Sequence, residues 1–523
     1  MDNISILDCT LRDGGYCNKW RFGHSNIETI ISGLETSGID IIECGYITQK
    51  ISSYDEDVTQ YRTFADLEEL IKDKKNNAMY VAMINFGEFS PEDIPDNKSG
   101  LIDGIRLAFH KKNAAAALDM CRILKEKGYA VFVQPMLTLS YSDSEFIELI
   151  KSINSVKPYA AYIVDSFGSM NANDLMRLFY LADNNLCDEI KLGFHSHNNL
   201  QLAYSNAQTL ISMPTERKLI IDSSIMGMGR GAGNLNSELI IQRFGDRYYI
   251  VPMLKIIDEI LGNFYKQNYW GYSLANYLSA TYNLHPNYAN YLDDKDTLSF
   301  ENMNDIFSLM SDEKRFEFDK GYIERIYYDF MERRNSDSFN IDKVTELIAG
   351  KNVLVIAPGK SIDDHSDEIA QLAASPDMVS FSVNFYCPFC ESDFIFLGNI
   401  KREREIKEHC KNSNSKLVAV SNVSITSPFA KLPYADLINE NEAVSDNSCL
   451  MLLKFLAGAG VKKIFIAGMD GYSYNREENY SRYQTGFIKR SKDIDAINKG
   501  LSDIVGKLSK KADISFITPT LVK

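Results

Sequence analysis

The first 250 residues alternate short apolar runs with longer stretches of helical periodicity. The apolar runs are rich in Val, Ile and aromatic residues, as buried parallel strands are. Amphipathic stretches such as 26–37 and 114–127 separate them. The pattern predicts strands at 4–10, 39–46, 78–86, 104–109, 130–137, 161–167, 189–197 and 218–227. Eight βα units in about 250 residues are typical of a TIM barrel, and an open doubly wound sheet is the alternative.

Polar side chains at the carboxyl ends of these runs favour the barrel. In a barrel the strand ends meet around one mouth, where active sites lie. We therefore predict an α/β fold with a (β/α)8 TIM barrel over residues 1–250. The polar residues at the strand ends are Arg12, Asp13, Glu43, Arg106, Gln134, Asp165, His195 and His197.

The alternation of apolar strands and helices ends near residue 250, and the following residues show a helical periodicity and many tyrosines. We predict a helical extension and linker over residues 251–345. A second α/β pattern begins near Asn352, which predicts a Rossmann-like α/β domain over residues 346–523. Its strands are expected at 352–357, 378–384, 394–397, 416–421, 463–467 and 514–518.

Composition narrows the class of protein. The net charge of −15 argues against nucleic-acid binding, which needs a basic surface. No apolar stretch approaches the roughly 20 residues that cross a bilayer, and a strand expected from Ile4 leaves no room for a signal peptide. Nine scattered cysteines suit a reducing compartment. We expect a cytoplasmic protein that has no membrane span and binds no nucleic acid.

The pair His195 and His197 closes an apolar run and carries the strongest chemical signal. Side chains two apart on a strand point to the same side, so both imidazoles converge on one point. Taken alone, the pair is equally typical of a polar strand end bonded to backbone. Asp13 and the glycine-rich segment 227–234 stand at the ends of neighbouring strands of the predicted barrel. One carboxylate with two imidazoles predicts a divalent-metal site.

These residues also carry a family resemblance. Residues 10–14, the pair His195 and His197, and Gly233 with Asn234 resemble the DRE-TIM metallolyase superfamily, most of all its 4-hydroxy-2-oxovalerate aldolase type. The resemblance covers about residues 1–250 and extends through the segment that holds His285. It implies that Asp13, His195 and His197 bind Mg²⁺ or Mn²⁺, with Zn²⁺ less favoured, and that Asn234 is a further ligand. It implies that Arg12 stabilises an enolate oxygen and that His285 contacts substrate.

The sequence departs from that aldolase type at the general base. A histidine of the family is replaced here by Tyr16. Free tyrosine titrates near 10, so this residue type is a better acid than base. Tyr16 and Glu43 therefore stand as catalytic candidates beside Arg12, and Glu43 is equally explained as a buried acid that orients Arg12. Arg230 occupies the glycine-rich segment, where HMG-CoA lyases carry a cysteine, so HMG-CoA is an unexpected substrate.

Three further polar residues at the predicted mouth are candidates for substrate binding. Arg106 can hold a carboxylate as a bidentate clamp or pair with a nearby acid. Gln134 and Asp165 can contact substrate or make structural hydrogen bonds at the rim.

The C-terminal half carries a weaker signal. Residues 358–361 form a glycine turn after a strand, which can cradle phosphate or simply connect strand to helix. With segments 382–384 and 467–471 this turn resembles sialyltransferase-like, nucleotide-utilising domains. The resemblance implies a nucleotide or nucleotide-sugar pocket near Gly359, Ser361, Asn384 and Asp470.

We therefore predict a divalent-metal-dependent aldolase or lyase acting on a 2-oxo acid. Its partner substrate is expected to be a sugar or nucleotide-sugar aldehyde in surface-polysaccharide biosynthesis, and a homodimer is among the expected assemblies. The alternatives are an acyl-CoA-dependent Claisen condensing enzyme and a non-catalytic barrel that serves as scaffold for the C-terminal domain.

Overall fold

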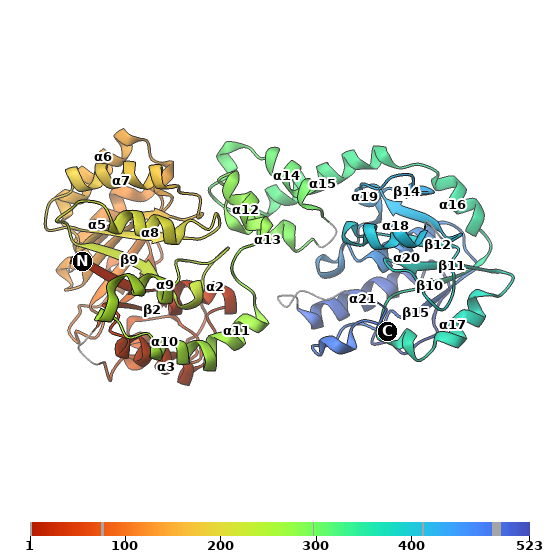
Figure 1. The fold of residues 1–523 in the computed structure, drawn as a ribbon, viewed down its shortest axis with the longest axis horizontal. Helices are drawn as coiled ribbons and strands as arrows, with labels where there is room; N and C mark the ends of the chain where they lie inside the picture. The colour runs from red at the N-terminus through yellow and green to blue at the C-terminus, as the bar shows by residue number, and fades with distance from the viewer. Residues whose placement is uncertain (1–2, 75–77, 296–297, 411–412, 484–492, 523) are drawn as a thin grey trace. The chain divides into compact units, whose positions relative to one another are not determined.

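The computed structural model describes residues 3–74, 78–295, 298–410, 413–483 and 493–522. The chain forms two compact units (Figure 1). The first comprises Met1–Asn290 with Asp312–Phe318, and the second Tyr291–Ser311 with Asp319–Lys523. Each unit is built around its own parallel sheet.

The first unit is a closed barrel of eight parallel strands. Each strand pairs with the next around the ring, and β1 pairs with both β9 and β2, which closes it. The predicted TIM barrel is confirmed, and the open sheet is wrong. The strands are β1 (Ile4–Asp8), β2 (Ile41–Ile47), β4 (Met79–Asn85), β5 (Gly104–Phe109), β6 (Ala130–Pro135), β7 (Ala160–Asp165), β8 (Lys191–Ser196) and β9 (Leu219–Ser223).

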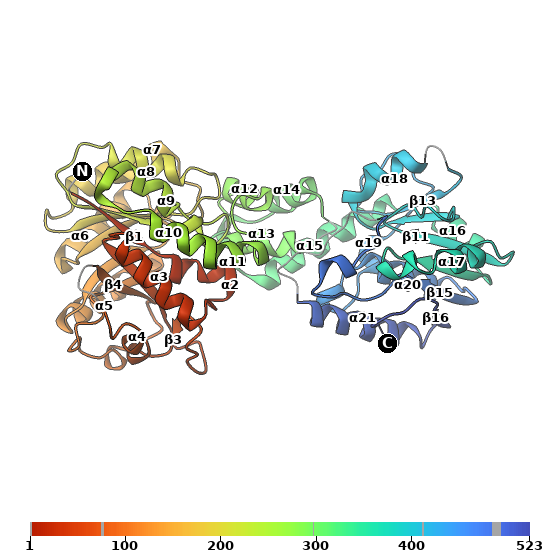
Figure 2. The same ribbon diagram turned by 60° about the horizontal axis from the view of Figure 1, so that its bottom comes forward.

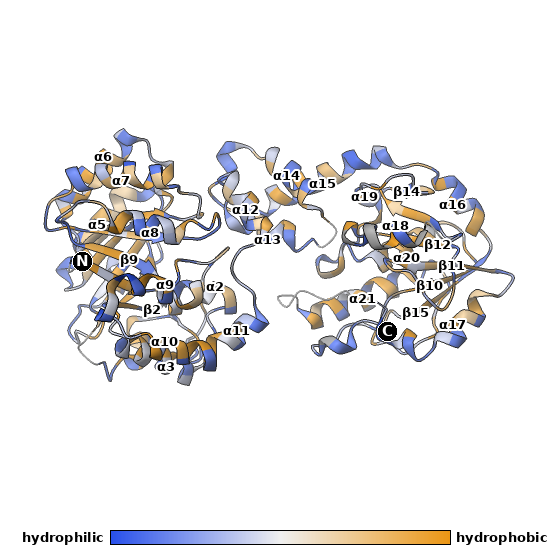
Figure 3. Cartoon of the chain, in the orientation of Figure 1, coloured by the Kyte–Doolittle hydropathy of each residue, from blue (hydrophilic) through white to orange (hydrophobic). Residues whose placement is uncertain are grey.

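Amphipathic helices follow the strands and bury their apolar faces on the barrel. The helices are α3 (His24–Thr36), α4 (Phe64–Leu70), α5 (Ala114–Glu126), α6 (Asp143–Val156), α7 (Ala172–Asn185) and α8 (Ala203–Ile211). Ser142 and Asn171 begin α6 and α7 with capping boxes, which satisfy backbone N–H groups of the first turn. Figure 3 shows the apolar residues gathered on the strands, with polar residues on the outer faces of α6 and α7.

Further short helices complete this unit. They are α1 (Thr10–Asp13), α2 (Gly15–Asn18), α9 (Ser237–Ile240), α10 (Val251–Ile256), α11 (Gly262–Gln267), α12 (Leu274–Thr281) and the start of α13 (Pro286–Asp293). Helix α10 runs beside α3 (Figure 2), where the missing side chain of Gly33 leaves room for Ile256. The segment 251–345 holds several helices, which divide between the two units.

The second unit holds a parallel sheet in the order β14-β13-β12-β11-β10-β15-β16. From β10 the chain adds strands in one direction as far as β14 and then returns to the other side of β10 for β15 and β16. The strands are β10 (Asn352–Ile356), β11 (Met378–Val383), β12 (Phe394–Leu397), β13 (Lys416–Val420), β14 (Ala430–Leu432), β15 (Lys463–Ala467) and β16 (Ile514–Phe516). The predicted α/β class is therefore confirmed here too.

The helices of the second unit are α14 (Phe300–Ser308), α15 (Lys320–Arg334), α16 (Ile341–Ile348), α17 (Ser366–Ala373), α18 (Glu403–Cys410), α19 (Tyr434–Leu437), α20 (Ser448–Gly458) and α21 (Ile494–Leu508). Within the described ranges of both units, none of the helices has the length and apolar character needed to cross a membrane. Two short edge strands, β14 and β3 (Gln60–Tyr61), were not predicted, because two or three residues show no usable alternation.

Candidate metal centre

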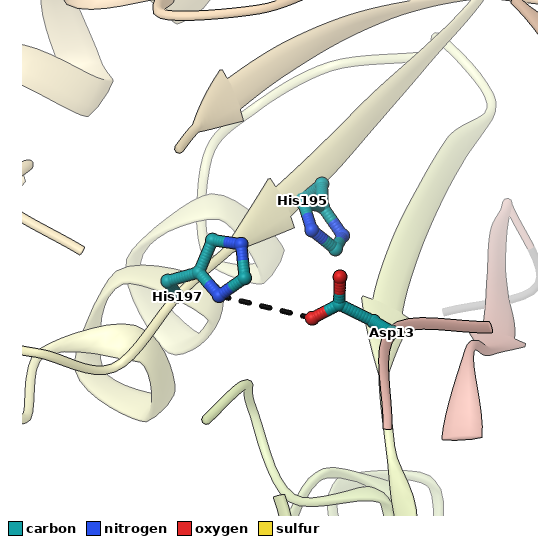
Figure 4. A group of neighbouring side chains, drawn as sticks. All are labelled: Asp13, His195 and His197. Carbon is teal, nitrogen blue, oxygen red and sulfur yellow. Dashed lines mark ion pairs between the residues drawn. The ribbon is translucent and has the colours of Figure 1, made fainter. Parts of the chain in front are cut away.

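Three side chains converge at the mouth of the barrel. Asp13, His195 and His197 each offer one ligand atom, and these atoms lie within 4.8 Å of one another. All three residues are at most 5% exposed. Figure 4 shows the carboxylate of Asp13 pointing toward the two imidazoles, whose ring centroids are 5.2 Å apart. The carboxylate and the two imidazoles predicted from sequence are thus brought together.

Local structure explains this convergence. Asp13 ends the single helical turn of α1, which begins directly after β1, and its backbone N–H donates to the Cys9 carbonyl at 2.8 Å. His195 lies on β8, and the His197 N–H donates to the Asp165 carbonyl at 3.2 Å just beyond the end of that strand. Because successive strand residues alternate between faces, the spacing of two places both rings on the same side.

The glycine-rich loop lies directly against the carboxylate. Asn234 forms a backbone bridge with His197, and its Nδ2 donates to Asp13 Oδ2 at 2.7 Å. A Cβ added at Gly229 would lie 2.7 Å from the same Oδ2, closer than real Cβ contacts come. Glycine is therefore needed at position 229 for the loop to approach Asp13.

The donor set fits a divalent cation. Among the described residues, two buried atoms at this point have no hydrogen-bond partner, namely His197 Nδ1 and Asn234 Oδ1. His197 Nδ1 lies 3.8 Å from Asp13 Oδ2, which is too far for a hydrogen bond. Buried polar atoms normally have partners, so unpaired ones facing a carboxylate indicate a site built for a ligand.

Asp222 on β9 completes the surroundings of the histidine pair. Its Oδ2 lies 2.9 Å from His195 Nδ1, which fixes the ring and leaves the other ring nitrogen for the site. Metal-binding histidines usually have such a carboxylate behind them. Asp222 was not among the predicted residues, although an Asp inside the apolar run 219–223 is a signal that could have singled it out.

The electrostatics favour the ligand form of these groups. Burial tends to raise the pKa of Asp13, but the Arg12 cation, with smaller contributions from the two histidines and Arg230, holds it well below its usual value. Burial lowers the pKa of His197 to about 3. At neutral pH, Asp13 is therefore a carboxylate and His197 a neutral imidazole, the states that bind metal.

A chain of buried ion pairs connects the metal-centre residues to other strands of the barrel. Arg12 Nε donates to Glu43 Oε2 at 2.9 Å, and Arg106 Nη1 donates to the same oxygen at 2.6 Å. Arg106 Nη2 reaches Asp222, and Arg12 Nη1 reaches Asp13. Within the described part of the chain, Arg12 Nη2 is buried and has no hydrogen-bond partner. One guanidinium N–H group next to the metal ligands is thus available to a ligand.

The other predicted mouth residues occupy different positions. Tyr16 is half exposed and packs edge-on against Trp20. Gln134 is buried at the end of β6. Asp165 accepts hydrogen bonds from the N–H groups of Ser169 and Met170, so its carboxylate holds the turn after β7, and burial raises its pKa to about 7.

His285 lies on the segment between α12 and α13, with its ring 5.8 Å from that of Phe167. Its Nδ1 accepts a hydrogen bond from the Asn287 N–H. Burial, aided by the Arg230 cation, lowers the pKa of His285 to about 3. The imidazole is therefore neutral at physiological pH.

We expect His285→Phe to weaken the acid sensitivity of folding. The unfolded chain takes up a proton at this residue near pH 6.5, whereas the native state resists it down to about pH 3, so native stability falls as the pH drops through this range. At pH 5 this loss is about 2 kcal/mol. Urea unfolding at pH 7 and pH 5 measures the difference. An equal loss of stability in wild type and His285→Phe contradicts the expectation.

The four predicted residues of the second unit also come together. The carboxylate of Asp470 accepts a hydrogen bond from the Ser361 N–H at 2.7 Å and another from its hydroxyl, and the Gly359 N–H donates to the carbonyl of Gly468. Gly359, Asn384 and Asp470 line a cavity of about 210 Å³. The cavity lies beyond the carboxyl ends of β10, β11 and β15.

Several known proteins are similar to the barrel of this chain. A family model described as HMGL-like matches residues 107–248. A 4-hydroxy-2-oxovalerate aldolase from Geobacillus genomosp. 3 is 28% identical over 239 residues, 46% of this chain and 69% of that one. An oxaloacetate decarboxylase from Mycobacterium tuberculosis is 23% identical over 251 residues, 47% of this chain and 72% of that one. The solved N-terminal domain of a candidate aldolase from Bacteroides vulgatus is 29% identical and covers 57% of this chain and 98% of that one, with a TM-score of 0.49.

The HMGL-like match lies over the part of the barrel that holds the histidine pair and the glycine-rich loop. The curated relatives extend the similarity to nearly half of the chain. Their names describe enzymes that break a carbon–carbon bond. Residues 107–248 of the barrel are thus similar to HMGL-like proteins, and these relatives support the enzyme class of the metal-dependent carbon–carbon lyases.

Proposed function

We propose that the barrel makes or breaks a carbon–carbon bond next to the carbonyl of a 2-oxo acid, through an enolate of the pyruvate type. The observation that carries the proposal is the unpaired, buried Nη2 of Arg12 beside the three converging side chains. An enolate oxygen needs positive charge that is already in place before the reaction. The similarity to 4-hydroxy-2-oxovalerate aldolases and to an oxaloacetate decarboxylase supports the same choice, because both names imply chemistry next to a 2-oxo group.

Asp13, His195 and His197 would hold the divalent cation, with Asn234 Oδ1 as a further ligand. One carboxylate, two imidazoles and an amide oxygen suit Mn²⁺ or Mg²⁺, and Zn²⁺ is less favoured. When bound, the ion supplies Lewis-acid polarisation of the carbonyl. The hydrogen bond from Asn234 Nδ2 and the ion pair with Arg12 keep the Asp13 carboxylate oriented toward the two rings.

Arg12 would place its free N–H against the oxygen that becomes negatively charged. Glu43 is fully buried and accepts from both Arg12 and Arg106, so we assign it the positioning of Arg12. Arg106 is likewise fully buried and engaged by Glu43 and Asp222, which suits support of the site better than direct contact with substrate.

Tyr16 is the residue we propose for proton transfer at the mouth. It follows the Asp13 turn directly and is half exposed, so a substrate can reach it. A neutral phenol donates a proton more readily than it accepts one, which suits protonation of an alkoxide or carbanion. Gln134, Asp165 and His285 remain candidates for substrate contact around the same mouth.

For the second unit we propose a nucleotide or nucleotide-sugar site that includes Gly359, Ser361, Asn384 and Asp470. The cavity lies between the ends of β10 and β15, where the strand order reverses. Ligands of open parallel sheets bind at this point. A sugar aldehyde used in surface-polysaccharide biosynthesis would connect this site with the aldolase chemistry of the barrel.

Exchange of the pyruvate methyl protons with D2O tests the proposed barrel chemistry, because it reports the enolate without knowledge of the aldehyde. We expect Mn²⁺-dependent exchange that NMR detects in the wild type and that falls at least a hundredfold in His195→Ala. A sample with Mn²⁺ and no protein gives the background. Absence of exchange in the wild type, or undiminished exchange in His195→Ala, contradicts the proposal. Release of free thiol from acetyl-CoA in the presence of a 2-oxo acid would instead favour the Claisen alternative.

A further inference from the structure

We propose that Arg230 forms an anion-binding subsite beside the metal centre, and that the second substrate of the barrel therefore carries a carboxylate or phosphate on its aldehyde. This inference rests on the proposed function and adds the charge class of the partner aldehyde. Arg230 stands in the glycine-rich loop between Gly229 and Gly231.

The guanidinium of Arg230 is held in place at the mouth. Its Nη2 donates to the Ser166 carbonyl at 3.1 Å, just beyond the end of β7. Its carbon Cζ lies 5.6 Å from the centre of the Tyr16 ring, within the range of a cation–π contact. The loop that carries it lies against Asp13 at Gly229 and is bridged to His197 at Asn234. The positive charge thus has a fixed position next to the metal ligands.

Arg230 differs in its partners from the buried arginines of the barrel. Arg12, Arg106 and Arg217 each form an ion pair with a buried or half-buried carboxylate. In the described ranges, no Asp or Glu oxygen lies within 4.0 Å of the Arg230 guanidinium, and its Nε is buried without a hydrogen-bond partner. A cation placed beside a site for a second cation costs electrostatic energy. An anion bound between them removes that cost.

The arrangement assigns this anion to the second substrate. Arg12 already offers a free N–H at the mouth of the barrel, next to Asp13, for the oxygen of the 2-oxo acid. Arg230 approaches from the loop after β9 and is anchored at Ser166. Ser166, which accepts the hydrogen bond from Arg230, also lines a cavity of about 390 Å³ together with Phe167 and Phe316 and with the acids Asp165 and Asp174. An aldehyde with a terminal anion therefore extends from the metal centre along Arg230.

Paired aldehydes test the charge preference. Aldol formation from pyruvate is measured with glyoxylate against acetaldehyde, and with glyceraldehyde 3-phosphate against glyceraldehyde. We expect the wild type to prefer an anionic aldehyde in kcat/KM and Arg230→Met to reduce that preference at least tenfold, with Arg230→Lys in between. Arg122→Met removes an exposed arginine elsewhere on the barrel and serves as the matched control, with its preference unchanged. Comparison of the glyoxylate pair with the glyceraldehyde 3-phosphate pair shows whether the subsite prefers a carboxylate or a phosphate.

Phosphate binding tests the proposed Arg230 subsite even if none of these aldehydes reacts. The two tryptophans of the chain, Trp20 and Trp270, both adjoin this subsite, because Trp20 packs on Tyr16 and Trp270 donates to the Met226 carbonyl of the same loop. Titration of the Mg²⁺-loaded protein with inorganic phosphate should change tryptophan fluorescence, with an affinity at least tenfold weaker in Arg230→Met. Equal phosphate affinity in the two proteins, or no response together with no charge preference, overturns the proposal. Pyruvate exchange tests the proposed function independently of either result.

Discussion

Arg12→Met is expected to lower the rate of pyruvate proton exchange by about a thousandfold, the largest catalytic effect predicted for this chain. Arg12 provides the free guanidinium N–H next to the metal ligands, and removal of one preorganised donor to an oxyanion typically costs a factor of about 100 to 1000. Loss of its ion pair with Asp13 adds to this effect. NMR-detected exchange in D2O with saturating Mn²⁺ measures it.

Arg12→Lys tests whether the reaction needs only the positive charge of Arg12 or also the geometry of its guanidinium. Lysine keeps the positive charge but cannot contact Glu43 and a ligand with the planar fork of arginine, so we expect only a partial return of activity. Circular dichroism and the Tm of each variant verify that the barrel is folded. A folded Arg12→Met protein with the exchange rate of the wild type would show that Arg12 does not stabilise the enolate.

Arg106→Met is expected to give the largest loss of stability, about 3–5 kcal/mol in the free energy of unfolding. Arg106 is fully buried, and both of its partners, Glu43 and Asp222, are buried carboxylates. Removing the shared cation leaves Asp222 without a guanidinium partner and leaves Glu43 with Arg12 alone, so the barrel interior holds more negative charge than before. Urea unfolding of the metal-free protein at pH 7 measures the change.

The matched control is Arg122→Met, which breaks an exposed pair with Asp119 on helix α5. We expect it to change the free energy of unfolding by less than about 1 kcal/mol, as exposed ion pairs do. Double replacement by Arg106→Met and Glu43→Gln should recover part of the lost stability, because one buried charge is removed. Equal stability of Arg106→Met and Arg122→Met contradicts the role assigned to this ion-pair chain.

The barrel could be predicted from the sequence because its strands are apolar runs separated by amphipathic helices. The three metal-centre residues could be predicted for a related reason. Their positions follow from the strand period and from the rule that strand ends meet at one mouth, so Asp13, His195 and His197 converge although the chain separates them widely.

The partners of these residues could not be predicted, because they depend on contacts across the barrel. The sequence leaves a substrate clamp and a pair with a nearby acid open for Arg106, and in the structure its guanidinium joins two acids that were not named as its partners, Glu43 and Asp222. Asp222 stands out as an acid inside the apolar run 219–223, but a single acid there does not show which side chain it contacts. Arg230 was seen only as the residue at the position of a family cysteine, and its lack of a carboxylate partner becomes visible only in three dimensions.

The central claim is a divalent-cation site formed by Asp13, His195 and His197, and equilibrium dialysis against Mn²⁺ tests it most directly. We expect one Mn²⁺ per chain in the wild type and at least a hundredfold weaker binding in His197→Ala and Asp13→Asn, both verified as folded. Failure of the wild type to retain Mn²⁺, Mg²⁺ or Zn²⁺, or retention unchanged in both variants, would contradict it.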